Sequence, residues 1–96
     1  MNNNRRKEIS RIIEEIESAV STAKEKLEEL QTSIESVRDE EQEYMDNMPE
    51  NLQGSERYET TEQAVDNLDS AASSIEKLID AMDTDDLIGY LNDAAE

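Results

Sequence analysis

The stretch that decides the fold is residues 9–37, ISRIIEEIESAVSTAKEKLEELQTSIESV, in which apolar side chains recur at alternating spacings of three and four. A second stretch, residues 58–82, YETTEQAVDNLDSAASSIEKLIDAM, repeats that spacing. The period places one apolar stripe along each of two helices. If the chain folds back near Leu52, the stripes meet in layers whose residue numbers sum to 102, such as Leu30 with Ala72. The pattern predicts a long antiparallel helical hairpin of the coiled-coil type.

The predicted layers run the length of both stripes. The first stripe comprises Ile9, Ile13, Ile16, Val20, Ala23, Leu27, Leu30, Ile34, Val37, Glu41, Tyr44 and Met48. The second comprises Tyr58, Thr61, Val65, Leu68, Ala72, Ile75, Ile79 and Met82. The polar exceptions Glu41 and Thr61 fall opposite each other, which we interpret as setting the register rather than as catalysis.

The fold class expected is all-α, in a single helical domain over residues 1–96. The expected elements are a helix over about 4–46, a turn over 47–55, a helix over about 56–82 and a short third helix over about 85–95. The expected capping residues are Asn3 or Asn4, then Ser55, then Thr84. Pro49 and Gly54 mark the turn.

The third helix follows a break in the second stripe. It is expected to turn four apolar residues towards the N-terminal end of the first helix: Leu87, Ile88, Leu91 and Ala94. The alternative is that this end stays open for a partner.

Composition excludes several function classes. The chain has 26 acidic and 9 basic residues and a net charge of −17, which opposes direct binding to nucleic acid or to anionic membranes. It has no Cys and no His. A calcium loop starting at Asp83 would need Gly at its sixth position and Glu at its twelfth, but Ile88 and Ala94 stand there. We therefore expect no cofactor, no metal, no catalytic residue and no enzymatic activity, with the cytoplasm as compartment.

Acidic residues gather in the second half of the chain. Residues 41–96 hold 16 acids and 2 bases, a net −14. The second helix carries an acidic face, interrupted at Ser73, at spacings of three and four: Glu59, Glu62, Asp66, Asp69, Glu76, Asp80 and Asp83. Such a ridge has a charge spacing comparable to that of phosphates along a nucleic-acid strand. It is either a decoy for a basic protein or the solvated outer face of an acidic hairpin.

The positions beside the seam suggest further contacts. On one side, Arg38 is expected to pair with Glu62, and Lys24 with Glu76. On the other side lies a small, apolar self-association surface, read either as a homodimer interface or as a widened core stripe: Ile12, Ala19, Ser33, Ala64, Ala71 and Leu78. The basic cluster Arg5, Arg6, Lys7 and Arg11 is expected to pair with Asp86, Asp93 and Glu96.

The turn carries a family resemblance. Residues 46–59, DNMPENLQGSERYE, resemble a turn found in small acidic helical proteins of bacteriophages and prophages of Gram-positive bacteria. The resemblance implies a phage accessory protein made in the bacterial host cytoplasm, of the kind that includes anti-CRISPR-like inhibitors and nucleic-acid mimics. Four turn residues are then expected to touch a partner: Glu50, Gln53, Glu56 and Arg57.

These observations lead to one functional expectation and one alternative. The first is a non-enzymatic phage-type inhibitor that binds a basic, nucleic-acid-binding bacterial protein through its acidic surface. The alternative is a structural or adaptor coiled coil that acts by oligomerisation.

Overall fold

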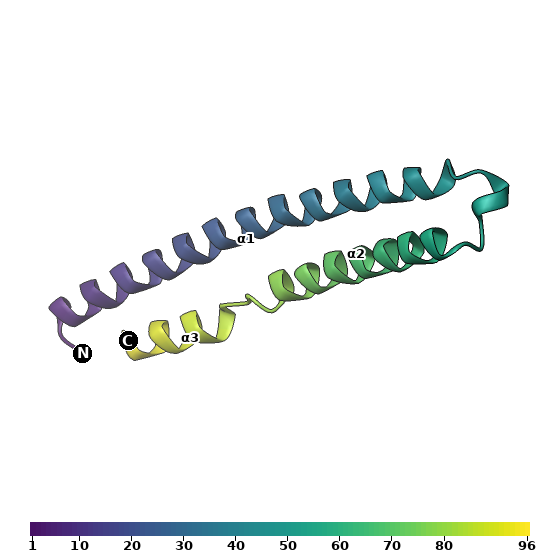
Figure 1. Ribbon diagram of the computed structural model, residues 1–96. Helices are drawn as coiled ribbons and strands as arrows, with labels where there is room; N and C mark the ends of the chain where they lie inside the picture. Colours follow the sequence, from purple (N-terminus) through teal and green to yellow (C-terminus); the bar gives the residue numbers. More distant parts are fainter.

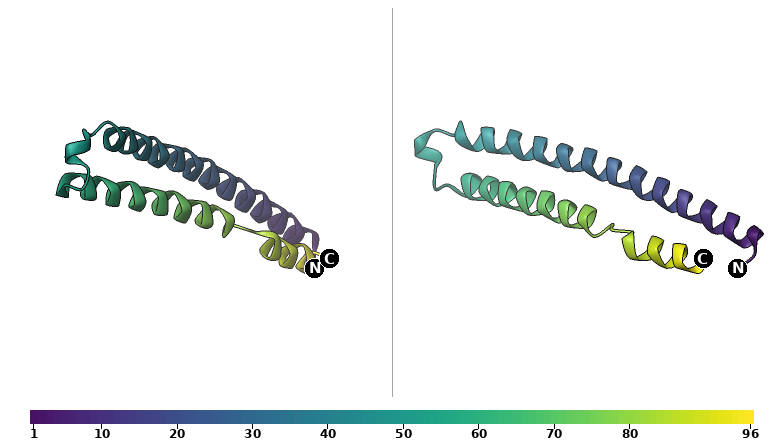
Figure 2. Two further views of the ribbon diagram at one scale, coloured as in Figure 1. Left: turned by 90° about the vertical axis from the view of Figure 1, so that its right-hand side faces the viewer. Right: turned by 180° about the vertical axis from the view of Figure 1, so that it is seen from behind.

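The chain forms a thin helical rod. The computed structural model describes residues 1–96 and contains α1 (Asn3–Asp46), the 3-10 turn η1 (Glu50–Leu52), α2 (Glu56–Asp80) and α3 (Asp85–Ala94). Figure 1 shows α2 and α3 running back along α1, so that both termini lie at one end. The further views in Figure 2 agree with this arrangement, and the rod measures 76 × 17 × 12 Å. The predicted all-helical class is confirmed.

The first helix begins one residue earlier than expected. Asn2 is its N-cap: the side-chain oxygen accepts a hydrogen bond from the Arg5 backbone N–H at 2.9 Å. The prediction of Asn3 or Asn4 as the cap is therefore wrong, because three Asn residues in a row offer the same chemistry. No Gly or Pro interrupts the helix before Asp46.

The turn is built as its sequence predicts. Gly54 has φ of +95°, a left-handed conformation that a side chain would strain. Ser55 then caps α2, since its hydroxyl accepts a hydrogen bond from the Tyr58 N–H at 3.2 Å. Both residues let the chain reverse within a few positions of Pro49.

The junction between α2 and α3 differs in detail. α2 ends at Asp80 rather than near Met82, and α3 ends at Ala94 rather than Ala95. Thr84 precedes α3 as expected, but its side chain makes no capping hydrogen bond. The Asp83 carboxylate instead accepts a hydrogen bond from the Asp85 N–H at 2.9 Å.

The interior is small. Met48, Thr61, Val65 and Ala72 are the buried residues, and the rest of the α2 stripe is half-buried against α1. A two-layer hairpin has little depth in which to bury a side chain fully.

Three predicted core positions of α1 are wrong. Leu30, Val37 and Tyr44 are 42%, 48% and 48% exposed, whereas Gln31, Arg38 and Met45, one residue further along, are half-buried. The apolar arc of α1 is wider than one facing helix covers, and α2 lies over one edge of it. A polar contact supports this placement of α2, since the Gln31 amide donates a hydrogen bond to the Ala72 carbonyl at 3.3 Å.

The C-terminal helix lies beside the start of α1. The Arg6 guanidinium donates to the Ala95 carbonyl at 2.9 Å, and Ile88 and Leu91 are half-buried as expected. Leu87 and Ala94 are exposed, so their predicted inward positions are wrong. With ten residues in α3, the N-terminal end of α1 is only partly covered.

Candidate interaction surfaces

The acidic flank of α2 is open to solvent. It comprises Glu59, Glu62, Asp66, Asp69, Glu76 and Asp80 of α2 together with Asp83, all of them exposed. Asp83 lies in the junction after α2 rather than on the second helix as predicted, because α2 ends at Asp80. Among these carboxylates, Asp69 alone takes part in an ion pair, with Arg38 at 2.9 Å. The flank therefore keeps nearly all of its negative charge.

The ion pairs across the seam differ from those predicted. Arg38 bridges Asp69 and its neighbour Asp39, each at 2.9 Å, rather than Glu62. The hydrogen bonds that the Arg38 guanidinium donates to Asp69 and, second, to Asp39 raise the pKa of Arg38 above its usual value. Arg38 is half-buried on the side of α1 that faces α2, and its guanidinium reaches Asp69, which lies about two helical turns along α2 from Glu62.

Lys24 does not pair with Glu76. It lines an open polar recess of about 400 Å³ together with Glu17, Glu25 and Glu28 of its own helix. Glu76 therefore stays unpaired on the acidic flank.

Within the basic cluster, Arg11 is the residue that forms ion pairs. Arg11 forms ion pairs with Glu8 and Glu15, one turn away on the same helix. The hydrogen bond from Arg11 lowers the pKa of Glu8, and the same bond raises the pKa of Arg11.

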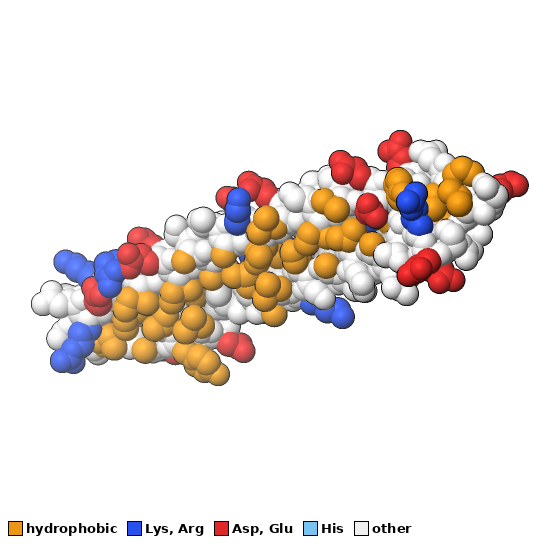
Figure 3. Space-filling view, in the orientation of Figure 1, with side chains coloured by type: hydrophobic (Ala, Val, Ile, Leu, Met, Phe, Trp, Pro, Cys, Tyr) orange, Lys and Arg blue, Asp and Glu red, His pale blue; other side chains and the backbone are white.

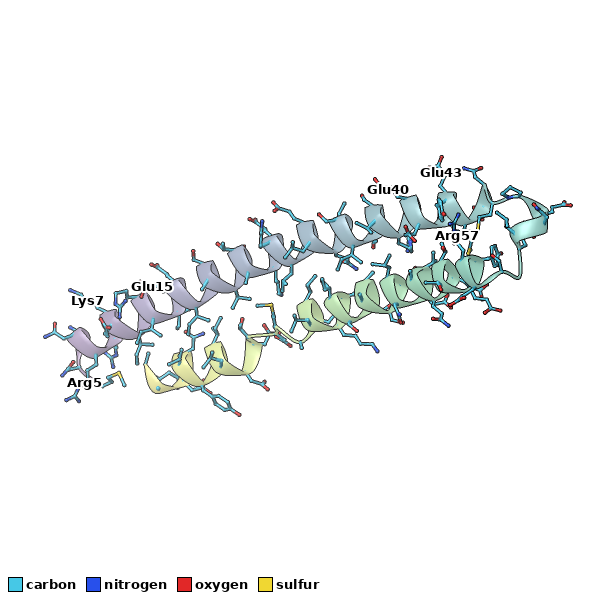
Figure 4. All side chains as sticks on the ribbon, in the orientation of Figure 1. Arg5, Lys7, Glu15, Glu40, Glu43 and Arg57 are labelled. Atoms are coloured by element: carbon cyan, nitrogen blue, oxygen red, sulfur yellow. The ribbon has the colours of Figure 1, made fainter.

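None of the predicted ion pairs with Asp86, Asp93 or Glu96 forms. Arg6 reaches α3 through a backbone carbonyl instead. Arg5 and Lys7 extend from the N-terminal end of α1 in Figure 4 and make no ion pair.

An apolar flank runs along the other side of the seam. Figure 3 shows a band of hydrophobic side chains along the face of the rod, with charged groups mostly at its borders. Within this flank an open groove of about 350 Å³ is lined by Leu30, Ser33, Ile34, Val37, Leu68 and Ile75. Five of those six residues are hydrophobic.

The α2 half of the predicted self-association surface borders this groove. Ala64, Ala71 and Leu78 are seven residues apart, so they share one edge of α2, and Leu78 is 52% exposed. On α1, Ala19 is exposed but Ile12 is half-buried. Sequence reasoning missed Leu30 and Val37 because it assigned both to the core.

The acidic and apolar flanks face apart. At about 100° per residue, Asp69 lies about 160° around α2 from Ala71. The Arg38–Asp69 pair marks one side of the seam, and the groove of Leu30 and Val37 marks the other. A partner on either flank leaves the opposite flank free.

The turn forms a third, smaller surface. A recess of about 280 Å³ is lined by Tyr44, Asn47, Met48, Pro49, Leu52 and Arg57. The predicted contact residues Glu50, Gln53, Glu56 and Arg57 are all exposed, and Arg57 makes no ion pair. Figure 4 shows Arg57 at the turn end of α2. Arg57 is seven residues before Ala64, so it lies at the end of the apolar flank.

Other kinds of site find no support in the geometry. No three acidic side chains are grouped where they would share a metal ion. None of the helices carries an apolar stretch of the length that crosses a bilayer. Comparison of the chain with protein-family models, curated proteins and solved structures finds no match.

Proposed function

We propose that the chain is a non-enzymatic, phage-type inhibitor that binds a basic, nucleic-acid-binding bacterial protein through its acidic flank. The observation that carries the proposal is a row of seven exposed carboxylates, of which Asp69 alone has a cationic partner. Such a row attracts Lys and Arg side chains, and it occupies the surface on which a basic protein holds phosphates.

The dimensions of the acidic flank suit that role. The segment from Glu59 to Asp80 lies within α2 and is about 32 Å long at 1.5 Å per residue. That length is close to one turn of duplex DNA, about 34 Å. The rod, 17 Å by 12 Å in cross-section, is also thin enough to enter a groove in which a partner protein binds nucleic acid.

The test is affinity capture from a Gram-positive bacterial lysate. The tagged chain is compared with a variant carrying Asp66→Lys, Glu76→Lys and Asp80→Lys. We expect the wild-type chain to capture a basic nucleic-acid-binding protein that excess DNA or added salt displaces, since counterion release makes such contacts salt-dependent. The variant should retain its helical circular dichroism and lose the partner.

A matched control carries three charge changes elsewhere. Glu15→Lys, Glu29→Lys and Glu43→Lys alter exposed positions of α1 and give the same change in net charge. Two of these changes remove exposed ion pairs, with Arg11 and Lys26, each worth less than about 1 kcal/mol, so the control should stay as helical as the wild-type chain. Figure 4 shows Glu15 and Glu43 on the side of α1 away from α2. If this control loses the partner as completely as the α2 variant, bulk charge rather than the acidic flank is responsible and the proposal fails.

A second candidate function rests on the apolar flank. Exposed Leu30, Val37 and Leu78 favour a structural or adaptor role, in which a partner helix lies along the groove. In that case Leu78→Glu would abolish capture of the partner, whereas the triple acidic-flank variant would leave capture unchanged.

A further inference from the structure

We propose that a second copy of this chain docks on the apolar flank, with the two rods antiparallel and a two-fold axis passing near Ser33 of α1 and Ala71 of α2. The result is a four-helix bundle in which each helix lies against its own counterpart. This proposal goes beyond the proposed function and stands on different residues.

The α1 edge of the flank is complementary to itself when reversed. Lys26 and Glu40 each lie seven residues from Ser33, so all three share one edge of the helix. An antiparallel α1–α1 contact centred on Ser33 brings Lys26 of each copy to Glu40 of the other, twice. Glu40 is exposed and forms no ion pair. Lys26 forms one exposed ion pair, with Glu29 at 3.6 Å, which it would give up to pair with Glu40 of the second copy.

Ser33 suits the centre of such a contact. It is small, and its hydroxyl already donates to the Glu29 carbonyl at 3.1 Å. Close approach of a second helix therefore leaves no unsatisfied donor at the axis. It also lines the groove, between Leu30 and Val37.

The α2 edge of the flank is also complementary to itself when reversed, through side-chain size and not through charge. Ala64 and Leu78 each lie seven residues from Ala71. In an antiparallel α2–α2 contact centred on Ala71, the large Leu78 of each copy meets the small Ala64 of the other. Alternating large and small residues across facing positions lets the layers interdigitate.

The two centres lie at one level of the rod. The hydrogen bond from the Gln31 amide to the Ala72 carbonyl places residue 31 beside residue 72. Ser33 and Ala71 are therefore within about one helical turn of the same height, so a single axis serves both contacts. A parallel dimer would place α1 over the partner's α2 and lose both the charge match and the size match.

The overlap is large enough for a stable dimer. The turn lies 14 residues beyond Ser33, so the paired length is about 42 Å. Across a rod 17 Å wide this covers about 700 Å² per copy, close to the roughly 800 Å² per partner of a standard interface. The acidic flanks face outward, so the net charge of −17 does not concentrate at the contact.

The test uses the absence of native cysteine. Ser33→Cys places a thiol at the proposed axis, and Ser73→Cys places one on the acidic flank; both serines are exposed, so neither change disturbs packing. We expect mild oxidation at about 100 µM chain, a concentration that saturates a micromolar dimer, to cross-link the Ser33→Cys variant at least tenfold faster. Equal rates for the two variants, or a monomer by sedimentation at that concentration, would overturn the proposal.

A charge exchange tests the antiparallel direction. Lys26→Glu should weaken the dimer about tenfold in Kd, because it places Glu against Glu40 twice. The double variant Lys26→Glu with Glu40→Lys should restore the wild-type Kd. If the double variant is as weak as the sum of its single changes, the two residues do not meet and the antiparallel arrangement is wrong.

Discussion

Substituting Val65 and Val37 separately by Ala tests whether α2 packs on α1 as the structure shows or as the apolar repeat alone predicts. Val65 is 6% exposed and Val37 is 48% exposed, although the two fall in one predicted layer. Val→Ala removes the equivalent of two methylene groups, worth about 0.8 kcal/mol each when fully buried. Scaled by burial, Val65→Ala should cost about 1.5 kcal/mol of unfolding free energy and Val37→Ala about 0.8 kcal/mol.

The assay is urea unfolding followed by circular dichroism at low micromolar concentration. Val65→Ala should shift the midpoint about twice as far as Val37→Ala, with the slope unchanged. The cost of Val37→Ala should then rise with chain concentration, because a second copy covers this residue in the dimer. Equal costs at the lowest concentration would show that Val37 belongs to the hairpin core, and the exposed-groove argument would fail.

Two further predictions concern the ion pairs. A double-mutant cycle of Arg38→Gln with Asp69→Asn should give a measurable coupling free energy in urea unfolding, whereas the cycle of Arg38→Gln with Glu62→Gln should give none. Coupling to Glu62 without coupling to Asp69 would show that Arg38 pairs with Glu62 instead. Because Arg11 lowers the pKa of Glu8, the contribution of this carboxylate to stability is present above its unfolded-state pKa and disappears as pH falls through its lower folded pKa. Carboxyl titration by NMR should find the pKa of Glu8 below the usual value for a glutamate, and Arg11→Gln should raise it; no change on this substitution would refute the pairing.

Much of the fold could be predicted from the sequence. The three helices, the Ser55 cap and the left-handed Gly54 follow from local chemistry, in which a few adjacent residues decide the outcome. The α2 stripe was also predicted correctly, since an apolar residue every three or four positions leaves one helix face to bury.

The position of α2 across α1 could not be predicted in the same way. Leu30 and Gln31 lie on adjacent edges of one broad stripe, and periodicity alone favours the apolar one. Which edge faces α2 also depends on polar bonds between the helices, such as Gln31 to Ala72 and Arg38 to Asp69. These bonds depend on side-chain reach in three dimensions, which a linear repeat does not encode.

Of the two surfaces, the acidic flank could be predicted from the sequence and the groove could not. The acidic residues of α2 were identified from spacing because an exposed ridge needs no tertiary contact. The groove residues Leu30 and Val37 were assigned to the core, since their apolar character has the same sequence signature whether they face α2 or a second chain.

The most direct test of a two-sided rod is a thiol-alkylation footprint with the captured partner. The thiols introduced by Ser33→Cys and Ser73→Cys are alkylated separately, in the chain alone at submicromolar and at high concentration, and then with the partner bound. The account predicts that self-association protects position 33 and that the partner protects position 73. A partner that protects position 33 and leaves position 73 reactive would contradict it, and would assign binding to the apolar flank.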